Sequence, residues 1–246
     1  LPERARERAE FRKDYPPGAH GYALYCFDLW YAYLNCGFRA SPTAGSASGV
    51  LPNPPGYNRV YVRLDGPFSY DAWFRGLVAG RSFVTNGPML FATVNGVAPG
   101  DTVTTLSADR FVEVACEVRS PEPIEKVEIV RNGSVIQTFT NPSMTNDTFV
   151  TQARVPVNGT CWIAARCFEK REDTVRFAHT APIWVVADGK PFVPKRYAAE
   201  YFLKKTRELI QTAETASFAS EDVRSDVMEN YKRAEALYAG LAKGGK

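Results

Sequence analysis

The chain has 246 residues, with 30 Lys and Arg against 27 Asp and Glu, and a formal net charge of +3. Hydrophobic residues make up 45% and charged residues 23%, which are ordinary globular values that exclude wholesale disorder. So small a net charge gives no electrostatic footprint for nucleic acid, and no apolar run approaches the roughly 18 residues of a membrane-spanning helix. The 2 histidines, His20 and His179, exclude a His-rich metal centre.

The 5 cysteines are an odd number without a C-x-x-C spacing, so we expect neither a disulfide framework nor a zinc site. A nucleophilic pair of Cys36 or Cys161 with either histidine stays arithmetically open, although Cys161 shares strand parity with Ile163, which favours the core. The chain begins at Leu1 rather than methionine, and a signal peptide would precede such a start. A secreted or periplasmic location therefore stays open.

The N-terminal region predicts two helices and a loop. Residues 1–14 alternate Arg and Glu as a solvated helix would, and residues 22–36 are an aromatic-rich run that predicts a buried helix, with Gly37 at its C-terminal end. Residues 44–49 are small and form either a flexible linker or a tight loop that lets backbone approach a ligand.

A strand, a helix and a second strand follow with short connections. Residues 60–64 predict the first strand, Ser69 caps the helix, and residues 82–85 predict the second strand. This order is typical of a βα unit.

Short strands at nearly regular spacing dominate the next segment, and Asn132-Gly133 between two of them predicts a hairpin with a type I′ turn. The number of strands indicates an immunoglobulin-like β-sandwich. We expect strands over residues 90–95, 111–119, 127–131, 134–139, 149–155, 161–168 and 175–186, the last with a break at Pro182. From Lys195 the pattern turns helical, and Ser220 caps the second of two helices that form a hairpin.

Polar residues at the ends of the predicted βα elements are the best candidates for a site, because α/β folds place their ligands there. Capping of loops and ordinary surface charge are the alternative explanation for the same residues. The candidate binding residues are Ser46, Asn58, Arg59, Arg81 and Asn86, with Thr85 beside them.

Four segments form a recognisable set in this order: residues 34–39 (LNCGFR), 43–46 (TAGS), 56–62 (GYNRVYV) and 80–88 (GRSFVTNGP). Together they resemble the C-terminal end of PHP-type metal-dependent hydrolases of the CehA/McbA (carbaryl hydrolase) type. The resemblance covers roughly residues 20–95. It implies the last βα units of a (β/α)7 barrel over residues 1–89, followed by the β-sandwich over 90–194 and the helical hairpin over 195–246, an α+β architecture.

In that family, divalent metals at the barrel mouth activate water for hydrolysis of ester, carbamate or phosphoester bonds. The resemblance places Arg59, Arg81 and Asn86 near the mouth. The family's H-x-H motif has no counterpart in this chain, and Ala47 and Gly49 stand where its Asp-x-His ligands would be. We therefore assign this chain no catalytic residue, no metal ligand and no cofactor of its own, since divalent metals would depend on ligands from a missing N-terminal part.

The resulting prediction is a C-terminal portion of a PHP-like hydrolase that is not catalytic by itself. A barrel fragment leaves an unpaired sheet edge, so we expect as partner a missing N-terminal barrel segment or another chain, or else pairing of residues 38–90 with the sandwich. The alternative is a β-sandwich module that binds a glycan, another small molecule or a protein. Six aromatic residues favour it: Tyr57, Tyr61, Phe68, Tyr70, Trp73 and Phe74.

Overall fold

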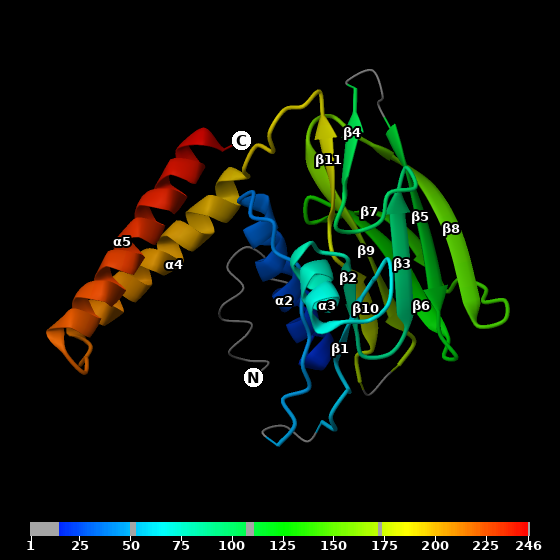
Figure 1. Cartoon of the computed structure of the whole chain (residues 1–246), viewed down its shortest axis with the longest axis horizontal. Coiled ribbons are helices and arrows are strands. Elements are labelled where there is room, and N and C mark those ends of the chain that lie inside the picture. Colours follow the sequence, from blue (N-terminus) through cyan, green and yellow to red (C-terminus); the bar gives the residue numbers. More distant parts are fainter. Residues whose placement is uncertain (1–14, 50–52, 107–110, 172–173, 246) are drawn as a thin grey trace. The chain divides into compact units, whose positions relative to one another are not determined.

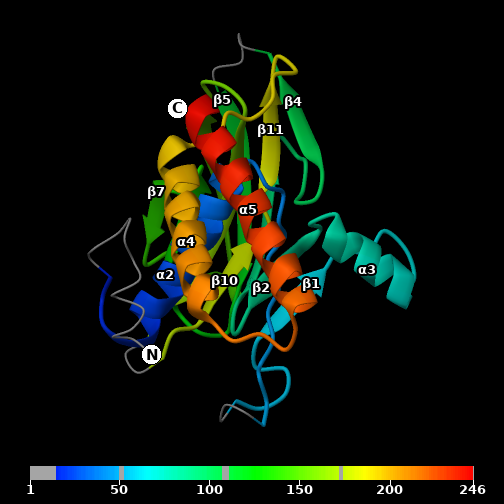
Figure 2. The same cartoon turned by 90° about the vertical axis from the view of Figure 1, so that its left-hand side faces the viewer.

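A computed structural model describes residues 15–49, 53–106, 111–171 and 174–245. These residues form a mixed α+β fold with two sheets and four helices, in agreement with the predicted class, and no barrel closes among them. The chain divides into two compact units (Figures 1 and 2). One runs from Arg39 to Phe192, and the other joins the residues up to Phe38 with those from Val193 onward. The predicted helix over residues 1–14 lies outside the described residues.

The unit Arg39–Phe192 contains both sheets. The larger sheet has the order β1-β2-β10-β9-β11-β4, with β6 on the other edge of β9 and β7 beyond β6. Its strands are β1 (Arg59–Val62), β2 (Ser82–Thr85), β4 (Thr102–Thr105), β6 (Ile124–Arg131), β7 (Ser134–Thr140), β9 (Cys161–Glu169), β10 (Phe177–Thr180) and β11 (Ile183–Ala187). The smaller sheet has the order β3-β5-β8, built from β3 (Met89–Val94), β5 (Phe111–Arg119) and β8 (Thr148–Pro156).

Both sheets contribute to one hydrophobic core. Alternate residues of β5, such as Val112 and Val114, are buried there together with Ile129 of β6 and Ile163 of β9. The alternation follows from the period of two in a strand, which sends successive side chains to opposite faces. Glu113 and Glu117 occupy the other face of β5, as their positions in the sequence predict.

The strand–helix–strand segment has the predicted elements but not the predicted pairing. Helix α3 (Tyr70–Val78) lies between β1 and β2, and the hydroxyl of its N-cap Ser69 accepts a hydrogen bond from Ala72 N at 3.1 Å. The two strands are antiparallel, with Arg59 opposite Thr85, so the parallel arrangement of a βα unit is wrong here. On its other side β2 pairs with β10, which confirms for β2 the expected pairing with the sandwich strands.

The predicted strand over residues 175–186 divides at Pro182 into β10 and β11, as expected. Strand β4 was not predicted, and it pairs in parallel with β11, which comes much later in the chain. The predicted hairpin at Asn132-Gly133 joins the antiparallel strands β6 and β7. Both turn residues have positive φ, +49° and +85°, as a type I′ turn requires.

The second unit consists of helices α2 (Gly18–Asn35), α4 (Arg196–Thr215) and α5 (Glu221–Gly244). Gly37 follows α2 with φ +93°, and Ser220 caps α5 by accepting a 3.2 Å hydrogen bond from Val223 N at its Oγ, both as predicted. A small cluster of buried residues joins α2 to α4: Ala32, Cys36, Ala198 and Ala199. At the end of α2, the Asn35 amide donates to the Tyr197 hydroxyl at 2.8 Å.

Candidate functional site

Ser46 and Asn58 lie together at the start of β1. The backbone N–H of Asn58 donates to Ser46 Oγ at 3.0 Å, and its side-chain amide donates to Gly45 O at 3.1 Å. These bonds hold the small-residue loop against the outer side of β1. The loop is therefore a fixed element at this point rather than a free linker.

Asn86 and Arg59 lie at the same end of the β1–β2 pair, because Arg59 is opposite Thr85 in the register. The side chain of Asn86 closes a loop across the sheet: its Oδ1 accepts from Phe177 N at 2.8 Å and its Nδ2 donates to Val175 O at 3.1 Å. Thr85 donates to Pro88 O at 2.6 Å. Asn86 and Thr85 thus satisfy backbone groups, while the Nε of Arg59 is buried and has no hydrogen-bond partner among the described residues.

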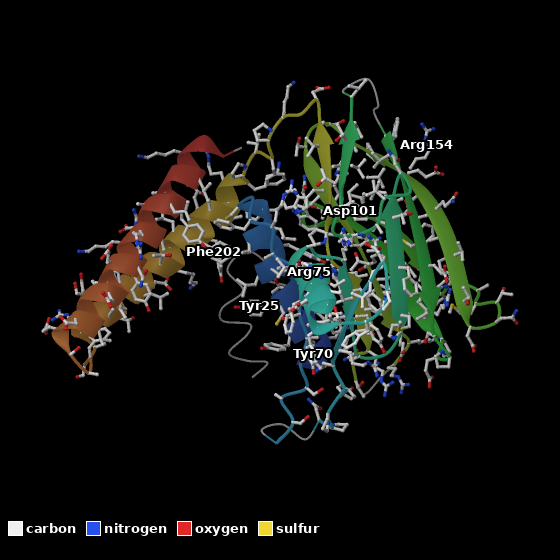
Figure 3. The ribbon with its side chains drawn as sticks, in the orientation of Figure 1. Tyr25, Tyr70, Arg75, Asp101, Arg154 and Phe202 are labelled. Atoms are coloured by element: carbon white, nitrogen blue, oxygen red, sulfur yellow. The ribbon has the colours of Figure 1, made fainter. Side chains whose placement is uncertain are left out.

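Arg81 lies at the opposite end of β2 from Asn86, about 17 Å away along an extended strand. It belongs to a network of four charged side chains in which two arginines face two aspartates. Arg81 Nη1 lies 2.6 Å from Asp65 Oδ2, and Arg63 Nη2 lies 3.2 Å from Asp101 Oδ2. Asp101 stands immediately before β4 (Figure 3). The structure therefore brings Ser46, Asn58, Arg59 and Asn86 to one end of the β1–β2 pair and places Arg81 at the other.

The partners of Arg81 were not predicted from the sequence. Arg63 and Asp65 lie in the connection after β1 and Asp101 in the connection before β4, and only the antiparallel register of β1 and β2 brings Arg63 beside Arg81. Part of this network could have been predicted from the sequence, because Arg63 and Asp65 flank Leu64 and so point to the same side of an extended segment.

The loop at residues 45–49 does not suit a divalent metal. Ala47, whose φ is +49°, and Gly49, whose φ is +89°, offer no side-chain ligand in the positions where the resemblance expects aspartate and histidine. Within the described residues, no group of three or more His, Cys, Asp and Glu side chains gathers in a way that would hold a metal ion.

His179 and Cys161 do not form a nucleophilic pair. Cys161 packs into the core between the sheets, whereas His179 is opposite Arg166 and so lies on the other face of the larger sheet. His179 Nδ1 donates to Thr180 O at 2.8 Å, and complete burial lowers its pKa to about 3, which keeps the ring neutral. Burial also raises the pKa of the Cys36 thiol to about 12, so Cys36 is not a thiolate nucleophile at neutral pH.

No protein-family model matches the chain, and none of the curated proteins compared with it matches. Among the described residues, every helix is too short or too polar to cross a bilayer.

Proposed function

We propose that this chain is the C-terminal, non-catalytic portion of a PHP-like metal-dependent hydrolase. In this proposal the segment that carries β1, α3 and β2 derives from the end of a (β/α)7 barrel, although its two strands pair antiparallel. The other strands of the two sheets correspond to an immunoglobulin-like sandwich, and α4 and α5 are the terminal helical hairpin. The catalytic metals would be held by a barrel portion that precedes Leu1 or belongs to another chain. The single observation that carries the proposal is an uncovered surface, which consists of the unpaired outer edge of β1 and the exposed apolar side chains of α3.

The outer edge of β1 has unpaired backbone groups. Arg63 N donates to Arg81 O at 2.7 Å, so the odd-numbered residues of β1 bond to β2, and the N–H and C=O groups of Val60 and Val62 point away from it. Within the described residues, none of these groups has a hydrogen-bond partner, whereas Asn58 N, on the same edge, is capped by Ser46. Folded proteins seldom leave such an edge bare, so a further strand is expected there.

Helix α3 exposes large apolar side chains at helical spacing. Tyr70 is 76%, Phe74 54% and Val78 82% exposed, and Phe68, just before the helix, is 68% exposed. Tyr70 lies at the start of α3 (Figure 3). An exposed apolar patch of this kind marks an interaction surface. We name Phe68, Tyr70, Phe74 and Val78 the α3 stripe, and propose that the barrel portion covers it.

The test begins with the coding region upstream of Leu1, read for an H-x-H motif. The longer polypeptide and the 246-residue chain are then assayed with Mn²⁺ or Zn²⁺ on p-nitrophenyl acetate and an aryl carbamate. We expect metal-dependent turnover by the longer polypeptide alone. In the longer polypeptide, Tyr70→Lys with Val78→Lys is expected to reduce turnover and soluble yield, because two charges would be buried in the proposed interface.

Leu237→Lys on α5 is the matched control, because Leu237 is a similarly exposed apolar residue, 48% exposed, outside the α3 stripe. Absence of an H-x-H motif upstream and from co-purifying chains would refute the proposal. Metal-dependent turnover by the 246-residue chain would refute its non-catalytic role.

The aromatic part of the α3 stripe favours a second candidate function, a module that stacks on a glycan. Phe68 and Tyr70 have ring centroids 6.0 Å apart, and Phe74 is exposed beside Trp73. Tyr57 and Tyr61 belong elsewhere, since Arg176 lies over Tyr57 and Tyr61 stacks on Phe83. Saturable binding on a glycan array that Phe74→Ala abolishes and Leu237→Ala leaves unchanged would select this function. If Phe74→Ala leaves glycan binding unchanged, the α3 stripe is not the glycan-binding surface.

A further inference from the structure

An apolar pocket of about 340 Å³ lies beside the edge strand of the smaller sheet. The run Met89–Thr93 of β3 lines it continuously, together with Tyr61 of β1 and Phe83 of β2. Because successive side chains of a strand point to opposite faces, a pocket lined by a continuous run of residues follows the edge of that strand rather than one of its faces. The pocket is therefore a groove along the free edge of β3.

Backbone groups of β3 are unpaired along this groove. Asn95 N donates to Glu113 O at 2.8 Å, so the odd-numbered residues of β3 bond to β5 and the even-numbered residues point outward. Val94 follows this pattern, since its N–H and C=O are paired with Val97 on the outer side, at 2.8 and 2.9 Å. Within the described residues, the outward N–H and C=O groups of Leu90 and Ala92 have no hydrogen-bond partner. Two donors and two acceptors thus line the groove in the spacing of a sheet ladder.

The walls and charges of the groove define what fits it. Tyr61 and Phe83 stack with centroids 5.1 Å apart, and Phe91 meets Phe83 edge-on at 5.6 Å, so the walls are aromatic. The Val94–Val97 pairing occupies the outer edge at one end. The arginines that border the groove, Arg63 and Arg81, already face Asp65 and Asp101. Charge complementarity therefore favours an uncharged occupant.

We propose that this groove binds a short, uncharged, extended peptide that pairs with Leu90 and Ala92 and becomes a fourth strand of the smaller sheet. Strand addition of this kind takes its affinity from backbone hydrogen bonds and its selectivity from pockets for alternate side chains. Apolar side chains of the peptide would contact Tyr61 and Phe83. The volume is at the low end of the range for ligand pockets, which suits a few residues rather than the edge of a second folded copy.

Amide hydrogen exchange of the ¹⁵N-labelled full chain tests the proposal. The probe is an acetylated, amidated pentapeptide of alternating Val and Thr, and its control has proline at two adjacent central positions, which removes an N–H from each edge. In the free chain we expect the amides of Leu90 and Ala92 to exchange faster than those of Phe91 and Thr93, which are paired with β5. Saturation with the probe slows Leu90 and Ala92 at least about tenfold and leaves Phe91 and Thr93 unchanged.

Ala98→Trp fills the groove, because Ala98 is a half-buried loop residue in its lining, and is expected to weaken the probe at least about tenfold. Ala219→Trp, at an exposed loop position, is the matched control. Slow exchange of Phe91 in both variants confirms that they fold. The proposal is overturned by slow exchange of Leu90 and Ala92 in the free chain, by no saturable binding at about 2 mM probe, or by binding that leaves those two amides unprotected, which would indicate an apolar pocket without strand addition.

Discussion

Gly76 allows α3 to pack closely against β1, because it has no side chain. A Cβ atom at this buried position of α3 would lie 2.5 Å from Val62 Cγ1 of β1 and 3.3 Å from Arg63 O. Ala normally stabilises a helix interior relative to Gly by about 1 kcal/mol, but here the overlap forces α3 away from β1. We expect Gly76→Ala to lower the free energy of unfolding by about 1–3 kcal/mol in urea titrations.

Gly240→Ala on α5 is the matched variant, because a Cβ atom there meets nothing within 4 Å. It should raise the stability of its unit by up to about 1 kcal/mol. Equal effects of the two substitutions would show that the contact with Val62 does not constrain α3.

Glu128 is the counter-charge of a buried arginine. Its Oε2 lies 2.6 Å from Arg166 Nε, and the two side chains are only 8% and 5% exposed. Removing one partner of a buried pair costs about 3–5 kcal/mol. Glu128→Gln should therefore destabilise the chain by that amount in urea unfolding, whereas Glu208→Gln, which breaks an exposed pair with Lys205, should cost about 1 kcal/mol or less.

His179 makes stability depend on pH. Its pKa is lowered from 6.5 to about 3 by burial, so below pH 6.5 the unfolded chain binds a proton that the folded chain does not. The stability that the neutral ring contributes is present above pH 6.5 and is lost as the pH falls toward 3, by up to about 1.4 kcal/mol per pH unit. His179→Asn should flatten the dependence of the unfolding free energy on pH in this window. His20→Asn measures the contribution of the other histidine, and an unchanged slope in His179→Asn would contradict the assignment.

At the scale of elements, the hairpin of β6 and β7 depends on a turn that only certain residues tolerate. Gly133 has φ +85°, where a Cβ atom costs roughly 1–2 kcal/mol. Gly133→Ala should lower the free energy of unfolding by that amount. Asn132→Gly keeps the turn conformation but loses the 3.0 Å hydrogen bond from Trp162 N to Asn132 Oδ1, so it separates the turn from the link to β9. No loss in Gly133→Ala would mean that the turn has changed type.

Local signals predicted the elements better than their partners. Asn132-Gly133, the Ser69 and Ser220 caps and the break at Pro182 each act within a few residues, and each agrees with the structure. Strand β4 was missed because its support comes from β11, far along the chain. The antiparallel pairing of β1 with β2 was also not predicted, because the position of β2 depends on its pairing with β10, which is distant in the sequence.

The candidate site was predictable in composition but not in geometry. Asn58 and Arg59 lie near Asn86 because β1 and β2 are antiparallel, so the start of β1 is beside the end of β2. Arg81 falls at the far end because the strands are antiparallel, and that reversal leaves no mark in the local sequence. The groove beside β3 was also not predicted, because it depends on the smaller sheet having fewer strands than the larger one.

At the scale of the whole molecule, thiol reactivity reports whether both units are intact. Cys26 is exposed, and the other four cysteines are buried: Cys36, Cys116, Cys161 and Cys167. Burial raises the pKa of Cys36 and Cys116 to about 12, which keeps them protonated. Titration with a chromogenic disulfide should find one reactive thiol in the native chain and five in denaturant, and Cys26→Ser should remove the native reaction. Fast reaction of further thiols would show that a unit opens.

The central position of β9 bears on how the chain folds while it is being made. β9 pairs with β6, β10 and β11, and β10 in turn holds β2 while β11 holds β4. Strands β2, β4 and β6, which are synthesised early, therefore cannot complete their pairing until the residues from Cys161 to Ala187 have been synthesised. On the ribosome, β1, β2 and β4 emerge with their apolar residues uncovered, and pairings between distant residues form slowly. A nascent chain halted before Cys161 would be a natural client for chaperones, and release of the last strands would close the larger sheet in one late step.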